Sequence, residues 1–171
     1  MTPLAAQPNE RTKRSRQGTQ PALIPLHQAY EAFFMRLSED FRRRCPGIIA
    51  QATKPILPGW FPFRMGRAGF AIYVVLAHGT IRVGLYLENG REKNKRAFDA
   101  LIAQRQAVEE ALGYSITWDR QDHLKQSRVF IIRRGSVVDS DESLSELREW
   151  TVQKVADFYR VFRPLVQQLE L

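Results

Sequence analysis

The stretch FAIYVVLAHGTIRVGLYLE, Phe70 to Glu88, predicts the centre of the fold. Its first half, Phe70 to His78, is apolar on both faces and rich in Val and Ile, which favour strands. Gly79-Thr80 is a short turn signal. The second half, Ile81 to Glu88, alternates as a half-buried strand does. The stretch therefore predicts an antiparallel hairpin, with Ile81, Val83, Leu85 and Leu87 on one face of the second strand and Arg82, Tyr86 and Glu88 on the other.

Two further short strands follow the hairpin. They read YSITWD, Tyr114 to Asp119, and SRVFIIRR, Ser127 to Arg134, joined by the connector RQDHLKQ. Apolar residues at helical spacing predict three helices, near residues 26–44, 95–112 and 143–169. The order α-β-β-α-β-β-α predicts an α+β domain whose mostly antiparallel four-stranded sheet is built from two hairpins and packed with helices.

The helix ends carry their own signals. Cys45-Pro46-Gly47 ends the first helix, and Gly113 is the expected C-cap of the second. Ser143 and Glu146 have the spacing of a capping box at the start of the third, in which Pro164 predicts a bend or a break.

Two segments fall outside this pattern. KPILPGWFPFRMGRAG, Lys54 to Gly69, is rich in Pro and Gly and is expected to be an ordered loop or edge segment and not a helix. Residues 1–20 lack aromatic residues and are expected to form a disordered basic tail before a single domain over 21–171. Four bases between Arg11 and Arg16 fit either a mobile arm that scans phosphates or a solvated tail.

Charge and composition narrow the class of protein. The 171 residues carry 26 Lys and Arg against 18 Asp and Glu, a net charge of +8. Such a balance attracts anions such as nucleic acid, although a basic surplus also simply aids solubility. One cysteine excludes an internal disulfide and indicates a reducing compartment, most simply a cytoplasm. No apolar run reaches the roughly 18 residues needed to span a membrane, and no signal peptide is expected.

No enzyme motif emerges from the sequence. Metal-dependent nucleases of the restriction type need a D/E-x-K strand, and none of the Asp or Glu residues has a lysine two positions later. The three histidines and Cys45 have no metal-ligand or nucleophile spacing. The sequence therefore predicts a protein without catalytic residues, metal or cofactor.

The segment ENGREKNKR, Glu88 to Arg96, concentrates positive charge. Asn89-Gly90 should close the strand, and Asn94 should cap a helix that begins at Lys95. Bases around a helix N-terminus, which is itself partly positive, indicate an anion site or only a solvated charged turn. If nucleic acid binds, the expected phosphate contacts are Arg91, Lys93, Lys95 and Arg96, together with Arg64, Arg67 and Arg82. The candidates for base stacking are Trp60, Tyr86 and Trp118, which could equally be core or loop anchors.

The chain also resembles a known family in an ordered set of motifs. These are F-x-x-x-L in the first helix, P-x-x-x-x-W, R-V-x-L-Y-L, N-K-x-x-F-D-x-L, E-x-x-x-G-Y-x-I-x-W, and a final helix with W-x-x-x-x-x-x-x-F-x-x-x-F; here they span Phe33 to Leu37, Pro55 to Trp60, Arg82 to Leu87, Asn94 to Leu101, Glu109 to Trp118 and Trp150 to Phe162. The set resembles the bacterial and archaeal family called domain of unknown function 4268, over about Leu23 to Leu169.

That family has no assigned activity, and its domain occurs alone or C-terminal to restriction-endonuclease-like domains. The resemblance therefore implies an accessory or recognition role near DNA or phage defence. Three functions stay open at this point. The first is a non-enzymatic module that binds nucleic acid or a nuclease-type partner; the second is a protein–protein adaptor or homodimer without nucleic-acid affinity; the third is a divergent nuclease. None of them involves a membrane.

Overall fold

The computed structural model describes residues 23–50 and 58–171, with side chains from Leu26 onward. The expected tail over 1–20, the four bases within it and residues 54–57 of the connector lie outside the described residues. The described chain has the α+β class expected, with four helices and five strands. In chain order these are α1 (Leu23–Arg44), β1 (Trp60–Arg64), β2 (Phe70–Ala77), β3 (Thr80–Leu87), α2 (Arg91–Ile102), α3 (Arg105–Leu112), β4 (Thr117–Asp119), β5 (Ser127–Arg134) and α4 (Asp141–Gln168).

The five strands form one antiparallel sheet in the order β1-β2-β3-β5-β4. The central hairpin is confirmed, but its turn is His78-Gly79, with φ of 51° and 70°, one residue earlier than the predicted Gly79-Thr80, because Thr80 already pairs with Ala77. Two positive φ values are the signature of the type I′ turn that matches strand twist. The alternation of β3 is also confirmed, because Ile81, Val83 and Leu85 all face the main core.

The prediction of four strands is wrong by one. The fifth strand, β1, arises inside the Pro- and Gly-rich connector. Among the described strands it pairs with β2 alone, and one isolated bridge joins Ala50 to Phe63. Pro62 has no N–H to donate, so it is compatible with an edge strand and not with a central one. The expectation that the connector contains an edge segment is therefore confirmed for its described part. The strand was not predicted, because its sequence does not alternate between apolar and polar residues.

The helix predicted over 95–112 is two helices. The first ends where Ala103 N–H donates to Asp99 and Gln104 N–H to Leu101, and Gln104 then starts the second. The break redirects the chain so that the apolar side chains of α2 and of α3 both reach the core. Gly113, with φ of 79°, caps α3 as expected.

Helix α4 begins at Asp141, two residues earlier than expected. Its N-cap is Ser140, whose Oγ accepts from the Ser143 N–H at 3.3 Å, so the predicted Ser143–Glu146 capping box is not formed. The helix continues through Pro164, and no break follows it.

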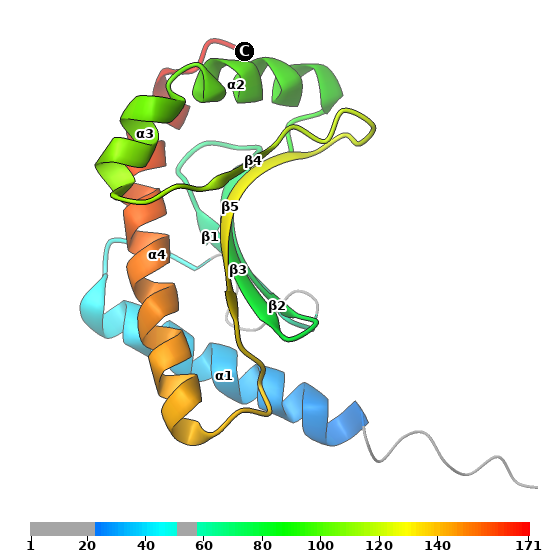
Figure 1. The fold of residues 1–171 in the computed structure, drawn as a ribbon, viewed down its shortest axis with the longest axis vertical. Coiled ribbons are helices and arrows are strands. Elements are labelled where there is room, and N and C mark those ends of the chain that lie inside the picture. The colour runs from blue at the N-terminus through cyan, green and yellow to red at the C-terminus, as the bar shows by residue number, and fades with distance from the viewer. Residues whose placement is uncertain (1–22, 51–57) are drawn as a thin grey trace, which may run out of the picture.

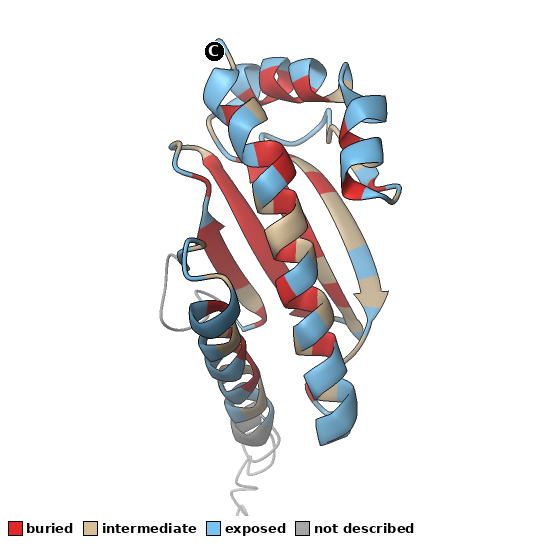
Figure 2. Ribbon diagram, turned by 90° about the vertical axis from the view of Figure 1, so that its left-hand side faces the viewer, coloured by how far each residue is buried: buried red, intermediate tan, exposed pale blue. Residues whose placement is uncertain are grey.

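The helices lie along one face and the ends of the curved sheet (Figure 1). Helix α4 crosses that face, with α1 and α3 beside it (Figure 2). The main core lies between these helices and the sheet, and it contains Phe34, Phe61, Phe63, Phe158 and Phe162.

Candidate nucleic-acid interface

Helix α2 begins one turn earlier than expected, at Arg91. Gly90, with φ of 85°, lets the chain leave β3 and enter the helix directly. The expected cap, Asn94, is therefore inside the helix and buried. Its Oδ1 accepts from the Asn89 N–H at 2.7 Å, and its Nδ2 donates to the Lys125 carbonyl at 2.8 Å. Asn94 thus ties the start of the helix to the connector between β4 and β5.

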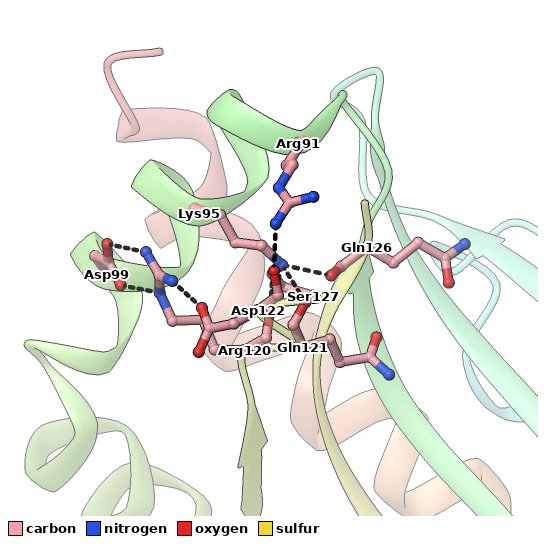
Figure 3. A network of polar contacts seen from close by, with 8 residues as sticks. All are labelled: Arg91, Lys95, Asp99, Arg120, Gln121, Asp122, Gln126 and Ser127. Atoms are coloured by element: carbon pink, nitrogen blue, oxygen red, sulfur yellow. Dashed lines mark hydrogen bonds and ion pairs between the residues drawn. The ribbon is translucent and has the colours of Figure 1, made fainter. Parts of the chain in front are cut away.

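Lys95 is buried, and its ammonium is used inside the protein (Figure 3). Nζ lies 2.5 Å from the Arg120 carbonyl, 2.8 Å from those of Gln121 and Gln126, and 3.0 Å from Ser127 Oγ. Oxygen cages of this kind also hold metal cations, and here the lysine supplies the cation. Predicting a phosphate contact at Lys95 requires an exposed ammonium at the start of a helix. The structure instead places Lys95 inside the protein.

The cage is built from a connector whose backbone turns inward. Gln121 adopts φ of 53°, an uncommon conformation for a residue other than glycine. Burial lowers the pKa of Lys95 from its ordinary value, and the negative charge of Asp122 opposes that shift. The connector therefore folds around an internal charge, which fixes its path.

Ion pairs close the outer side of the cage. Arg120 binds Asp99 of α2 in bidentate fashion, at 2.8 and 2.9 Å, and also contacts the Asp122 carboxylate. The hydrogen bonds from Arg120 lower the pKa of Asp99. Arg91 donates to the Asp122 carbonyl at 2.6 Å. We call this assembly, made of Arg91, Asn94, Lys95, Asp99 and residues 120–127, the α2 clasp.

The bases of ENGREKNKR therefore divide into two groups. Arg91 and Lys95 belong to the α2 clasp, and Lys93 and Arg96 are exposed without a partner among the described residues. Most of the segment's chemistry is structural: it fastens a connector about 30 positions downstream.

Two other predicted site residues are also structural. The Arg67 guanidinium donates to the carbonyls of Val166 at 2.6 Å and Leu169 at 2.7 Å, at the C-terminus of α4. The Trp118 indole donates to Glu109 at 3.1 Å, and its ring packs against Phe98 and Phe162. Trp118 therefore anchors the core.

The remaining candidates, Arg64, Arg82, Trp60 and Tyr86, come together on the sheet face that none of the described helices covers (Figure 1). We call this the open face. The strand register places its residues in rows across β1, β2, β3 and β5. Arg64, Ala71, Tyr86 and Arg128 form the first row, Pro62, Tyr73, Gly84 and Phe130 the second, Trp60, Val75, Arg82 and Ile132 the third, and Ala77, Thr80 and Arg134 a partial fourth.

Phe130 lies at the centre of the open face between two arginines. The guanidinium carbons of Arg82 and Arg128 lie 4.6 and 5.2 Å from its ring centroid, within the range of cation–π contacts. Gly84, opposite Phe130, makes this possible: a Cβ at Gly84 would lie 2.6 Å from the Cβ of Phe130. The glycine therefore leaves room for an arginine–aromatic–arginine arrangement.

Three aromatic side chains pack beside it. Trp60, Tyr73 and Tyr86 meet edge to face, with ring centroids 5.0 to 6.0 Å apart. Tyr86 is only 1% exposed, so it supports the cluster and offers no surface for stacking. Trp60 is partly exposed and keeps that capacity. Burial and the charge of Glu88 raise the pKa of Tyr73 to about 12.

The open face carries more positive than negative charge. Glu88 accepts hydrogen bonds from Tyr73 and Gln126, and Asp119 pairs with Arg128 at 2.9 Å. Arg64 and Arg134 are exposed and have no partner among the described residues. The four arginines Arg64, Arg82, Arg128 and Arg134 thus stand against two acids.

A hollow of about 250 Å³ lies at the end of the open face near the β2–β3 turn. Its lining is Trp60, Val75, Ala77, His78, Thr80 and Arg82. The Nε of Arg82 is buried and has no hydrogen-bond partner among the residues that the structure describes, and the guanidinium Nη1 lies 3.5 Å from the Tyr86 hydroxyl.

Sequence reasoning missed Arg128, Phe130 and Arg134 as site residues. Their strand was predicted with its observed bounds, and their alternate spacing already placed them on one face. The missing information was that β5 lies beside β3, which puts Arg128 and Phe130 next to Arg82.

Comparisons with known proteins give one match. The model of a family described as domain of unknown function (DUF4268) matches residues 29–166. Comparison with curated proteins and with solved structures gives no match. Among the described residues, no cluster of three His, Cys, Asp or Glu side chains could hold a metal ion, and no helix could cross a membrane.

Proposed function

The chain belongs to the DUF4268 family, a domain of unknown function, and on the chemistry of its open face we propose that it is a non-enzymatic module that binds nucleic acid there. One observation carries the proposal. Arginines alternate with aromatic side chains on the face that the described helices leave uncovered, and Arg82 and Arg128 both lie against Phe130.

This pairing of residue types suits nucleic acid in two ways. Guanidinium groups bind phosphate through paired N–H donors, and aromatic rings and arginine planes stack on bases. The net charge of +8 adds a long-range attraction for a polyanion. The proposal needs no cofactor, and the single cysteine favours a cytoplasmic setting.

The proposal moves the expected contacts away from the α2 clasp. Arg64 and Arg134 are the exposed arginines on the open face and are the first choice for phosphate contacts. Lys93 and Arg96, on α2, remain candidates for a second contact region. A role beside restriction-type nucleases, or in phage defence, stays an extension of this proposal.

The test compares two variants of equal charge. R64Q/R134Q removes two exposed arginines from the open face, and R36Q/R42Q removes two exposed arginines from α1; none of the four has a partner in the described ranges 23–50 and 58–171. Binding of labelled single-stranded and duplex oligonucleotides is measured by fluorescence anisotropy at several salt concentrations. Each lost phosphate contact should lower the slope of log K against log salt by about one unit.

We expect R64Q/R134Q to lower the slope by about two units and R36Q/R42Q to leave it nearly unchanged. The four bases between Arg11 and Arg16 could bind nucleic acid on their own. A variant of the whole chain with Arg11, Lys13, Arg14 and Arg16 changed to Gln removes that contribution, so any binding that remains comes from the rest of the protein. If that variant shows no salt-sensitive binding, the nucleic-acid proposal fails. A protein adaptor or homodimer would then be the better account.

A further inference from the structure

The hollow on the open face has the chemistry of a nucleotide site. Resting on the proposed function, we propose that the protein prefers single-stranded nucleic acid, and that the hollow receives one unpaired base. Trp60 provides the stacking wall, and Arg82 provides the hydrogen-bond donor.

Size is the first argument. A volume of about 250 Å³ lies just below the range of about 300–1,000 Å³ that is usual for small-molecule sites, so the hollow suits a small occupant. A single nucleobase is a small planar group of this kind, whereas a base pair is about twice as large.

The lining supplies the second argument. Trp60 is partly exposed and sits at the wall of the hollow, and indole rings stack on every kind of base. Arg82 contributes a planar guanidinium whose buried Nε has no acceptor within the described part of the chain. Buried donors normally have a partner, so a base or phosphate oxygen is the missing acceptor.

The surroundings of the hollow give the third argument. Arg82 also touches Phe130, which in turn touches Arg128, so basic and aromatic groups continue from the hollow across the open face. A strand with one base in the hollow could therefore run over Phe130 with its phosphates near Arg128 and Arg64. Duplex bases are paired and stacked, and none could enter without being flipped out.

The experiment uses the full chain and two probes, a 12-nucleotide single strand and the duplex of the same sequence. Four variants are compared: W60L removes the stacking ring, W60F keeps one, and R82K keeps the charge but loses the planar donor. W150L is the control, because Trp150 is also partly buried but lies on α4, in the helix layer. Melting temperatures are recorded for all of them.

We expect W60L to weaken single-strand binding about tenfold, within the range for loss of one stacked base. W60F should restore most of it, and W150L should have no effect. R82K should weaken binding without changing the salt slope, because the charge is kept. Quenching of tryptophan fluorescence by the oligonucleotide should diminish in W60F.

The outcomes separate this inference from the proposed function. If the wild type binds in a salt-sensitive manner but W60L and R82K bind equally well, the hollow is not a base site and only the open-face proposal survives. Equal affinity for duplex and single strand overturns the inference in the same way. If W60L fails to fold, the single-strand affinity of R82K and the fluorescence quenching of W60F test whether the hollow binds a base. Absence of any binding overturns both.

Discussion

Replacing Lys95 by Met tests the α2 clasp, because methionine keeps the length of the side chain and removes the ammonium. The change leaves the four oxygens of the cage without their common donor. Ser127 Oγ still donates to the Arg120 carbonyl at 2.7 Å, and the Leu124 N–H still donates to the Gln121 carbonyl at 2.8 Å. The Gln126 carbonyl therefore loses most.

The size of the effect follows from the Gln126 carbonyl. A buried acceptor left without a donor costs about 1–3 kcal/mol. Water can reach the connector from its exposed side, which favours the lower half of that range. We therefore expect K95M to lower the free energy of unfolding by about 1.5 kcal/mol.

Urea unfolding followed by far-ultraviolet circular dichroism measures this loss. With a slope of about 2 kcal/mol per molar urea, the midpoint should fall by about 0.75 M. Lys93 is the matched control, since it lies two positions away on α2, is exposed and has no partner among the described residues. K93M should change the stability by less than about 0.5 kcal/mol. If K95M and K93M are equally stable, the cage does not stabilise the fold and the reasoning fails.

Three further variants test other contacts. G84A should destabilise the fold by about 1–3 kcal/mol in thermal or urea unfolding, because the new Cβ would lie within 2.7 Å of β5, whereas G47A, with open space around it, should be nearly neutral. R67M should cost about 1–2 kcal/mol through the lost cap of α4, and the exposed R64M almost nothing, so equal values would contradict the cap. The pKa of Tyr73 is raised to about 12, so its contribution is complete below pH 10 and is lost as the pH rises towards 12. The stability of the wild type relative to Y73F should therefore fall by about 2 kcal/mol over that interval, and a constant difference would contradict the burial of the hydroxyl.

The sequence predicted those parts of the fold that local periodicity encodes. The alternation of β3 and the apolar runs of β2 and β5 identified three strands, and the stripe of α4 identified the longest helix. Strand β1 escaped because an edge strand of five residues containing Pro62 has no periodicity to show.

The candidate site was less accessible to such reasoning. A run of charged residues is typical of a solvated turn. The residues next to Lys95 in the sequence do not indicate that a connector 25 to 32 positions later folds over its ammonium. Trp118 had two possible faces in a short strand, and only the packing on Phe162 decides between them. Conversely, Trp60 and Arg82 were selected by residue type alone, and the register of two hairpins brought them to one hollow.

Photochemical cross-linking tests whether the open face binds single-stranded nucleic acid. The full-length protein is irradiated with a single-stranded oligonucleotide, and the cross-linked peptides are mapped by mass spectrometry. We expect cross-links on the strands of the open face, at Trp60 and Phe130, and we expect them to disappear at high salt. Cross-links confined to residues 1–20 or to the outer surface of α1 and α4 would contradict it.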